Sequence, residues 1–132
     1  ESTCRPEALR HLRRLDVRYE PPPLPVLAIV PAFEGERPEL PEPDRTHLVR
    51  LVPPFGVVPE ELEEVYPLRQ LQIPNELDLE QIRTVTEALS RFLERYGERY
   101  EEILLFNNER IWGNALVDAC KNVGDKLKVI KF

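Results

Sequence analysis

Short apolar runs bounded by proline or polar residues predict β-strands along the chain. Val26–Val30 is an unbroken apolar run, which is typical of a strand covered on both faces. Thr46–Val52 alternates two sets of side chains, as a second strand does. Three further strands are predicted at Arg69–Ile73, Ile103–Phe106 and residues 126–132.

Apolar residues that recur every three or four positions predict helices between these strands. The strongest signal lies in residues 75–97, where Asp78 suits an N-cap and Gly97 suits a stop. Further helices are predicted over residues 7–19 after Pro6, over residues 60–66 with Pro59 at the first helical position, and over residues 109–124 ending at Gly124.

Strands that alternate with helices predict an α/β fold. Because crossovers between parallel strands are right-handed and place helices on both faces, we expect a three-layer sandwich with a mostly parallel sheet. A chain of 132 residues and 15.4 kDa suits one domain over residues 1–132. Residues 31–45 are proline-rich, acidic and without periodicity, and loops of this length are usually functional or disordered.

The segment Pro53–Pro67 combines clustered prolines, one glycine and an acidic run. Pro53 and Pro54 end the preceding strand, and Gly56 permits a tight turn. The acidic run after Pro59 is expected to be a solvated helix face. We therefore predict a strand-to-helix turn at Gly56.

In a parallel α/β sheet, ligands bind beyond the carboxyl ends of the strands. Four loops should gather there: Pro31–Phe33, Pro53–Gly56, Pro74–Asn75 and Phe106–Asn108. Amide side chains can donate to and accept from a base, and aromatic rings can stack on one. The alternatives are an asparagine turn or cap and aromatic rings that close the core. The candidate ligand-binding residues are Pro31, Phe33, Phe55, Gly56, Asn75, Asn107, Asn108 and Trp112.

His47 is the candidate catalytic residue. It opens a strand beside Asp44 and Arg45 and could transfer protons. The alternative is a hydrogen-bonded structural role. His11 lies among arginines in the first predicted helix, where a surface position is expected. The chain contains no GxGxxG, GxxxxGK[ST] or GxSxG motif, which argues against nucleotide binding of those kinds.

Composition narrows the classes of function. The net charge of −6 gives no support to unaided nucleic-acid binding, although the arginines of the first predicted helix could form a local patch. Cys4 and Cys120 are far apart, so we expect neither a metal site nor a disulfide framework, and no cofactor is indicated. No segment suits a signal peptide or a membrane span, and a cytoplasmic location is expected. Arginine excess without methionine is compatible with a heat-adapted source.

The segment "FGVVPEELEEVYPLRQLQIP", residues 55–74, resembles a signature of a domain in archaeosine synthase, the archaeal relative of tRNA-guanine transglycosylase. The order of the other segments is also similar, from about Arg5 to Phe132. The resemblance implies a fold similar to uracil-DNA glycosylase. It also implies a link to archaeosine formation, in which lysine is attached to a 7-cyano-7-deazaguanine base in tRNA before a radical enzyme completes the modification.

One departure from the family pattern concerns its chemistry. The family's first strand runs into Pro-Cys-Ser, followed by Lys-Pro-Tyr and a Ser-His pair. Here Ala32 and Phe33 replace the cysteine and serine, which removes the obvious nucleophile, and Thr46 precedes His47. The resemblance therefore favours a non-catalytic accessory domain that docks a protein partner in a tRNA-modification complex, with tRNA reached through that partner. The alternatives are an active base-modifying enzyme and a structural subunit of a larger assembly.

Overall fold

The computed structural model describes residues 19–31, 39–53, 56–62 and 76–131. The strands are β1 (Val26–Pro31), β2 (Thr46–Val52), β3 (Gly56–Pro59), β4 (Glu102–Asn107) and β5 (Leu127–Lys131). The α-helices are α3 (Leu79–Tyr96), α4 (Glu109–Trp112) and α5 (Ala115–Ala119). Short 3-10 turns complete the described elements: η1 (Pro43–Arg45), η2 (Glu60–Leu62), η4 (Gly97–Arg99) and η5 (Lys121–Lys126).

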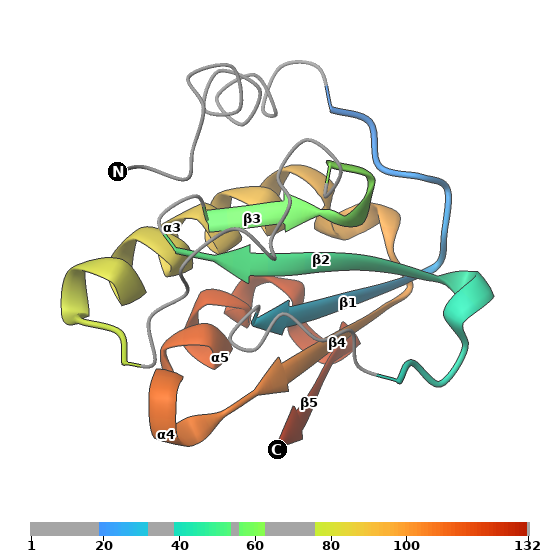
Figure 1. Cartoon of the computed structure of the whole chain (residues 1–132). Helices are drawn as coiled ribbons and strands as arrows, with labels where there is room; N and C mark the ends of the chain where they lie inside the picture. Colours follow the sequence, from blue (N-terminus) through green and yellow to red (C-terminus); the bar gives the residue numbers. More distant parts are fainter. Residues whose placement is uncertain (1–18, 32–38, 54–55, 63–75, 132) are drawn as a thin grey trace.

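The five strands form one sheet in the order β3-β2-β1-β4-β5. β1 pairs in parallel with β2 and β4, β4 pairs in parallel with β5, and only β3 runs antiparallel to its neighbour β2. The predicted α/β class and mostly parallel sheet are confirmed. The chain order reverses between β1 and β4, so the carboxyl ends of these two strands flank the switch point of the sheet (Figure 1).

The sheet has two apolar faces, because successive side chains of a strand point to opposite sides. The helix face carries Leu27 and Ile29 and packs against α3 and α5, which lie on the same side of the sheet in Figure 1. The second face carries Val26, Ala28 and Val30, which pack with Leu48, Leu104 and Phe106. The described α-helices thus form one layer, and the second helical layer expected of a three-layer sandwich is not among the described residues.

Helix α3 forms where the periodicity predicts it. Asp78 is its N-cap, with a reciprocal capping box: the Gln81 backbone N–H donates to the Asp78 carboxylate (2.8 Å), and the Asp78 backbone N–H donates to the Gln81 side chain (3.0 Å). Gly97 is the C-cap, as predicted, although its φ of −58° is right-handed. The apolar stripe of α3 buries Val85, Leu89, Phe92, Leu93 and Tyr96.

The turn at Gly56 differs from the prediction. Gly56 begins strand β3 and pairs with Val52, so a hairpin rather than a strand-to-helix turn follows β2. After Pro59 the chain forms the 3-10 turn η2, and residues 63–66 of the predicted helix lie outside the described residues. This position nevertheless requires glycine, because Gly56 has φ +92° and a Cβ there would lie 2.5 Å from the Ala88 Cβ on α3.

The predicted helix over residues 109–124 is divided into α4, α5 and η5. Gly113 separates α4 from α5, because its φ of +55° does not fit a right-handed helix, and α5 ends at its C-cap, Cys120. Gly124, the predicted stop, has φ +61° and lies inside η5. The predicted helix over residues 7–19 and the predicted strand Arg69–Ile73 lie outside the described residues. None of the helices in the described ranges has the length and apolar character needed to cross a membrane.

Candidate functional site

The carboxyl ends of β1, β2 and β4 meet at one edge of the sheet, as the topology predicts. Pro31 pairs with Leu51 near the end of β2, and Asn107 ends the neighbouring strand β4. Gly56 lies at the same edge through its pairing with Val52. Among the predicted ligand-binding residues, Phe33, Phe55 and Asn75 lie outside the described residues. Ligand binding at this edge stays a prediction.

The asparagines at the end of β4 have different environments. Asn108 caps α4, because its side-chain oxygen accepts a hydrogen bond from the Arg110 backbone N–H (3.1 Å), which is the cap that the sequence left as an alternative. Asn107 is buried and donates through Nδ2 to the Gly113 carbonyl (3.1 Å), while its Oδ1 has no hydrogen-bond partner within the described ranges. Trp112 packs in the main core, and no described residue forms a hydrogen bond with its Nε1.

His47 lies near the amino end of β2, at the end of the sheet opposite to the carboxyl ends of the parallel strands. Its Cα pairs with Leu27, and its side chain is 2% exposed on the helix face. The His47 ring stacks between two tyrosine rings: its centroid lies 6.1 Å from that of Tyr100 and 6.3 Å from that of Tyr19. The candidate catalytic residue is therefore separate from the candidate ligand-binding edge.

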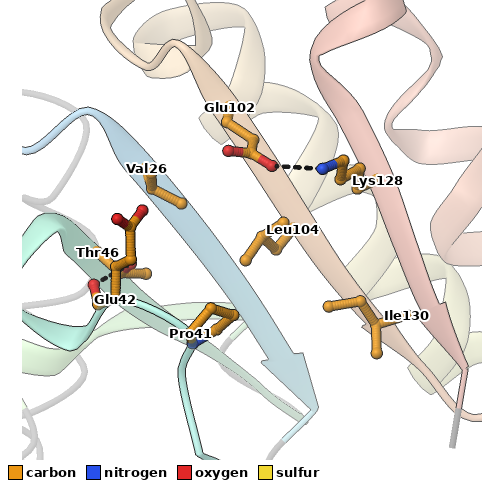
Figure 2. A pocket seen from close by; sticks show the side chains of 8 residues that line it. All are labelled: Val26, Pro41, Glu42, Thr46, Glu102, Leu104, Lys128 and Ile130. Carbon is orange, nitrogen blue, oxygen red and sulfur yellow. Dashed lines mark hydrogen bonds and ion pairs between the residues drawn. The ribbon is translucent and has the colours of Figure 1, made fainter.

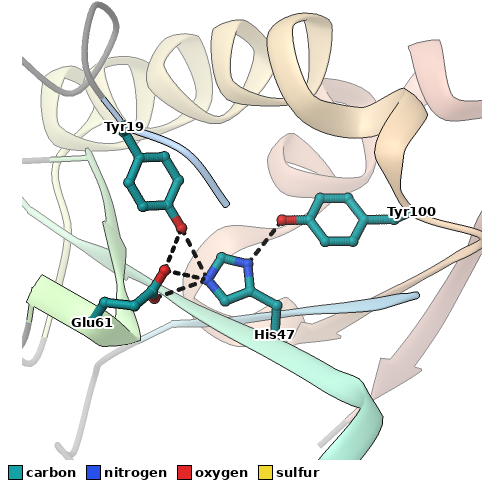
Figure 3. A network of polar contacts seen from close by, with 4 residues as sticks. All are labelled: Tyr19, His47, Glu61 and Tyr100. Atoms are coloured by element: carbon teal, nitrogen blue, oxygen red, sulfur yellow. Dashed lines mark hydrogen bonds and ion pairs between the residues drawn. The ribbon is translucent and has the colours of Figure 1, made fainter. Parts of the chain in front are cut away.

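Four side chains form a hydrogen-bonded network around this imidazole (Figure 3). His47 Nδ1 lies 2.8 Å from the Tyr100 hydroxyl, and Nε2 lies 2.9 Å from Glu61 Oε2 and 3.0 Å from the Tyr19 hydroxyl. Tyr19 donates its own proton to Glu61 Oε1 at 2.6 Å. The network thus joins the segment before β1, strand β2, the turn η2 and the residue that follows η4.

Charge and hydrogen bonding determine which atoms carry protons. Burial opposes ionisation of Glu61, but hydrogen bonds from His47 and Tyr19 outweigh it and lower the pKa of this carboxyl. Glu61 then accepts from Nε2–H, so in the neutral imidazole Nδ1 accepts from the Tyr100 hydroxyl. Burial, together with the Glu61 charge, raises the pKa of both Tyr19 and Tyr100 above the ordinary tyrosine value, which keeps both hydroxyls protonated.

The hydroxyl, the imidazole and the carboxylate are bonded in the same order as in acyl-transfer triads, but here the hydroxyl is buried. Tyr100 is 1% exposed, so its hydroxyl cannot meet a substrate. Solvent reaches the network through Glu61, whose side chain is 40% exposed. Both ring nitrogens of His47 already have partners. The arrangement matches the structural role that the sequence left as an alternative for His47.

The partners of His47 were not predicted from the sequence. Glu61 belongs to the acidic run expected to be a solvated helix face; its side chain is 40% exposed, yet its carboxylate also bonds to His47 and Tyr19. Tyr19, Glu61 and Tyr100 lie 28, 14 and 53 residues from His47 along the chain. No periodic pattern connects positions at such separations, so the network depends on tertiary packing.

A pocket of about 350 Å³ lies on the second face of the sheet (Figure 2). Its floor and walls are mainly apolar, and an ion pair between Lys128 and Glu102 (3.2 Å) lies at its rim. Thr46 at its other side donates to the Glu42 carbonyl (2.7 Å). The lining residues are Val26, Pro41, Glu42, Thr46, Glu102, Leu104, Lys128 and Ile130.

Metal-ligating chemistry finds no support in the described ranges, where no group of three or more His, Cys, Asp or Glu side chains is placed to hold an ion. Cys120 is fully buried in the main core, and burial raises the pKa of its thiol to about 12. A thiol held protonated in this way is a poor nucleophile.

The sequence of this chain is similar to one protein family and to several curated proteins. The profile of a family described as "Domain of unknown function (DUF5591)" matches residues 40–129. A tRNA-guanine(15) transglycosylase of Haloferax volcanii is 36% identical over 94 residues, covering 71% of this chain and 16% of the relative. The enzyme of the same name from Methanobrevibacter smithii is 27% identical over 124 residues, covering 82% of this chain and 18% of the relative.

A third relative of that name, from Saccharolobus solfataricus, is 38% identical over 60 residues, covering 46% of this chain and 12% of the relative. The chain therefore spans less than a fifth of the length of these curated relatives. No solved structure matches it significantly.

Proposed function

The chain belongs to the DUF5591 domain family, and on that premise we propose that it is a non-catalytic, accessory domain in tRNA modification, which docks a protein partner. The relatives are transglycosylases by name, and the chain corresponds to a small part of each. A domain-sized part that lacks the family's cysteine and serine is better suited to positioning a partner than to catalysis. In this proposal tRNA is reached through the partner.

The environment of His47 is the observation that carries the accessory role. The pair Thr46–His47 resembles the Ser-His pair of the family pattern, so His47 is the residue from which proton transfer would be expected. Its imidazole is 2% exposed, and both nitrogens bond to side chains of this chain. A general base must reach a substrate proton within hydrogen-bond distance, directly or through one water. His47 instead holds Tyr100 and Glu61 together.

A lysine-transfer assay tests the accessory role. The purified chain is incubated with tRNA that contains 7-cyano-7-deazaguanine and with labelled lysine, and product is measured by mass spectrometry of the nucleosides. We expect no transfer above the background without protein. Transfer that disappears in His47→Asn, while the circular dichroism spectrum is retained, would refute the proposal.

A pull-down from the native lysate tests the pathway. The tagged chain should recover a transglycosylase or a radical enzyme, together with tRNA, and ribonuclease treatment should leave the protein partner bound. Recovery of an unrelated assembly without RNA would assign the chain to the structural-subunit alternative. A cytoplasmic location, a heat-adapted archaeal source and a uracil-DNA-glycosylase-like fold stay predictions, the last supported by the four parallel strands.

A second candidate, an active base-modifying enzyme, is favoured by one observation. Asn107 Oδ1 is a buried acceptor at the carboxyl end of β4 and Trp112 Nε1 is a buried donor in the main core, and neither has a hydrogen-bond partner among the described residues. Buried polar groups are seldom left unpaired, so a ligand or water at either atom would lower the free energy of the site. A base that offers both a donor and an acceptor could fill this role.

Binding of the free base 7-cyano-7-deazaguanine distinguishes this candidate from the accessory role. Trp112, the single tryptophan, reports on the site by fluorescence. The enzyme candidate predicts a saturable change that Asn107→Ala removes and Asn108→Ala retains, because only the Asn108 oxygen is already used as a cap. An unchanged emission at every concentration of the base would exclude the enzyme candidate.

A further inference from the structure

Strand β5 forms an exposed edge of the sheet. Within the described ranges it pairs only with β4, and it lies at the outer side of the sheet in Figure 1. Lys128 is 72% exposed, Lys131 is 71% exposed, and Val129 between them is 37% exposed. The outer side of such a strand offers backbone N–H and C=O groups to any further extended chain.

The lysines of the chain are concentrated near this edge. All four lysines of the sequence lie between positions 121 and 131, although the net charge of the chain is −6. Lys128 pairs with Glu102 (3.2 Å), and Lys131 pairs with Glu109 (3.0 Å). Exposed pairs of this kind are weak, so carboxylates of a partner can replace them.

The same lysines exclude a second copy as the favoured occupant. Two β5 strands paired edge to edge would bring lysines from both copies together, and exposed lysines on an edge are a common device against such pairing. An acidic strand has the opposite effect, because its carboxylates would face Lys128 on one side of the sheet and Lys131 on the other. Charge complementarity therefore selects an acidic partner.

The pocket on the second face lies directly beside this edge. Lys128 and Ile130 form its β5 wall, Leu104 of β4 lies next to them, and Val26 of β1 lies across the pocket (Figure 2). A strand added outside β5 would direct alternate side chains toward the same face as Ile130. In strand addition, main-chain hydrogen bonds supply affinity and such pockets supply specificity.

We propose that β5 is a docking edge for an extended acidic segment of a partner protein, which adds to the sheet as a further strand and places one apolar side chain in the pocket beside Ile130. This inference rests on the accessory function proposed above and gives the chemistry of the partner. The partner is recognised by an extended backbone, by carboxylates that flank an apolar residue and by the absence of lysine opposite β5.

The test uses a short blocked peptide of valine and glutamate with one central leucine, added to the isotope-labelled full chain. Amide shift changes should concentrate in Leu127–Lys131 and at Leu104. The double variant Lys128→Glu with Lys131→Glu should bind about tenfold more weakly. A peptide with lysine in place of glutamate should bind this variant better than it binds the original chain.

Two controls separate strand addition from nonspecific charge attraction. Lys121→Glu makes the same kind of charge change on η5, outside β5, and should leave the affinity within about twofold. Two peptides are prepared that are N-methylated at alternate residues, one at the odd and one at the even positions. One of them should bind and the other should lose binding, because only alternate N–H groups of an added strand face β5. This control uses the unmodified chain, so it remains decisive if the double variant fails to fold.

Several results would overturn the proposal. These are shift changes outside β5 and the pocket, an equal loss of affinity in Lys121→Glu, unchanged binding of both N-methylated peptides, or dimerisation of the free chain through β5. Shifts in β5 caused by an RNA duplex and not by the peptide would assign the lysines to nucleic acid. Peptide binding involves no tRNA, so its failure is distinguishable from failure of the lysine-transfer and pull-down tests.

Discussion

Replacing Tyr100 with phenylalanine tests the His47 network most directly. The ring and its stacking on His47 are retained, and only the hydroxyl that lies 2.8 Å from Nδ1 is removed. Tyr100 is 1% exposed and His47 is 2% exposed, so solvent cannot supply a replacement donor without opening the core. A buried acceptor left without a partner costs about 1–3 kcal/mol of unfolding free energy.

For a domain of this length, a loss of that size lowers the melting temperature by about 4–11 °C. Urea unfolding followed by Trp112 fluorescence and by circular dichroism measures the free energy, and coincident curves establish a two-state transition. Tyr19→Phe is the matched control, because it removes a hydroxyl bound to Glu61, whose side chain is 40% exposed and can turn to water. Its loss should be smaller, below about 1 kcal/mol.

The proton assignment has its own measurement. In the neutral imidazole of His47, nitrogen chemical shifts should show the tautomer protonated at Nε2, and Tyr100→Phe should leave that tautomer in place. The reasoning is refuted if Tyr100→Phe costs less than about 0.5 kcal/mol, or no more than Tyr19→Phe, because the hydrogen bond would then contribute nothing that water does not replace.

Three further predictions concern other parts of the molecule. The pKa of Glu61 is lowered in the folded state, so its contribution to stability is complete above its unfolded-state pKa of about 4.3. This contribution is lost as the pH falls through the lower folded-state pKa. Urea midpoints measured across this pH range should therefore change less in Glu61→Gln than in the original chain. Gly56→Val should cost more than about 2 kcal/mol by urea unfolding, because it combines a positive φ with a Cβ 2.5 Å from Ala88. The Cys120 thiol, with its pKa raised to about 12, should react with thiol reagents only after unfolding, as peptide mass spectrometry can show.

Each of these has a control or a contradicting outcome. Gly113→Val also requires a positive φ of +55°, but no atom of the described residues lies within 4 Å of its Cβ, so it should cost less than Gly56→Val. An equal cost would remove the contact with α3 from the explanation. If the urea midpoint of Glu61→Gln falls with decreasing pH as steeply as that of the original chain, other carboxyls cause the acid sensitivity. Native-state labelling of Cys120 at the unfolded-state rate would contradict its burial.

Local patterns predicted most of the regular structure. Strands β1, β2, β4 and β5 and helix α3 lie where apolar runs and periodicity place them, because these signals depend on neighbours within a few residues. The hairpin at Gly56 was missed, because Pro59 suits both a helix start and the end of an edge strand. The break at Gly113 was missed, because a glycine within a helical pattern does not by itself reveal its φ.

The sequence by itself determined the α/β class, the mostly parallel sheet and the gathering of Pro31, Gly56 and Asn107 at one edge, because strand polarity follows from the alternation of strands and helices. Only the tertiary structure decided that His47 is enclosed by Tyr19, Glu61 and Tyr100. It also decided that the last strand is a lysine-rich edge beside a pocket. Contacts between residues 14 to 53 positions apart, and the order of strands in a sheet, arise from packing of the whole chain, which no local spacing records.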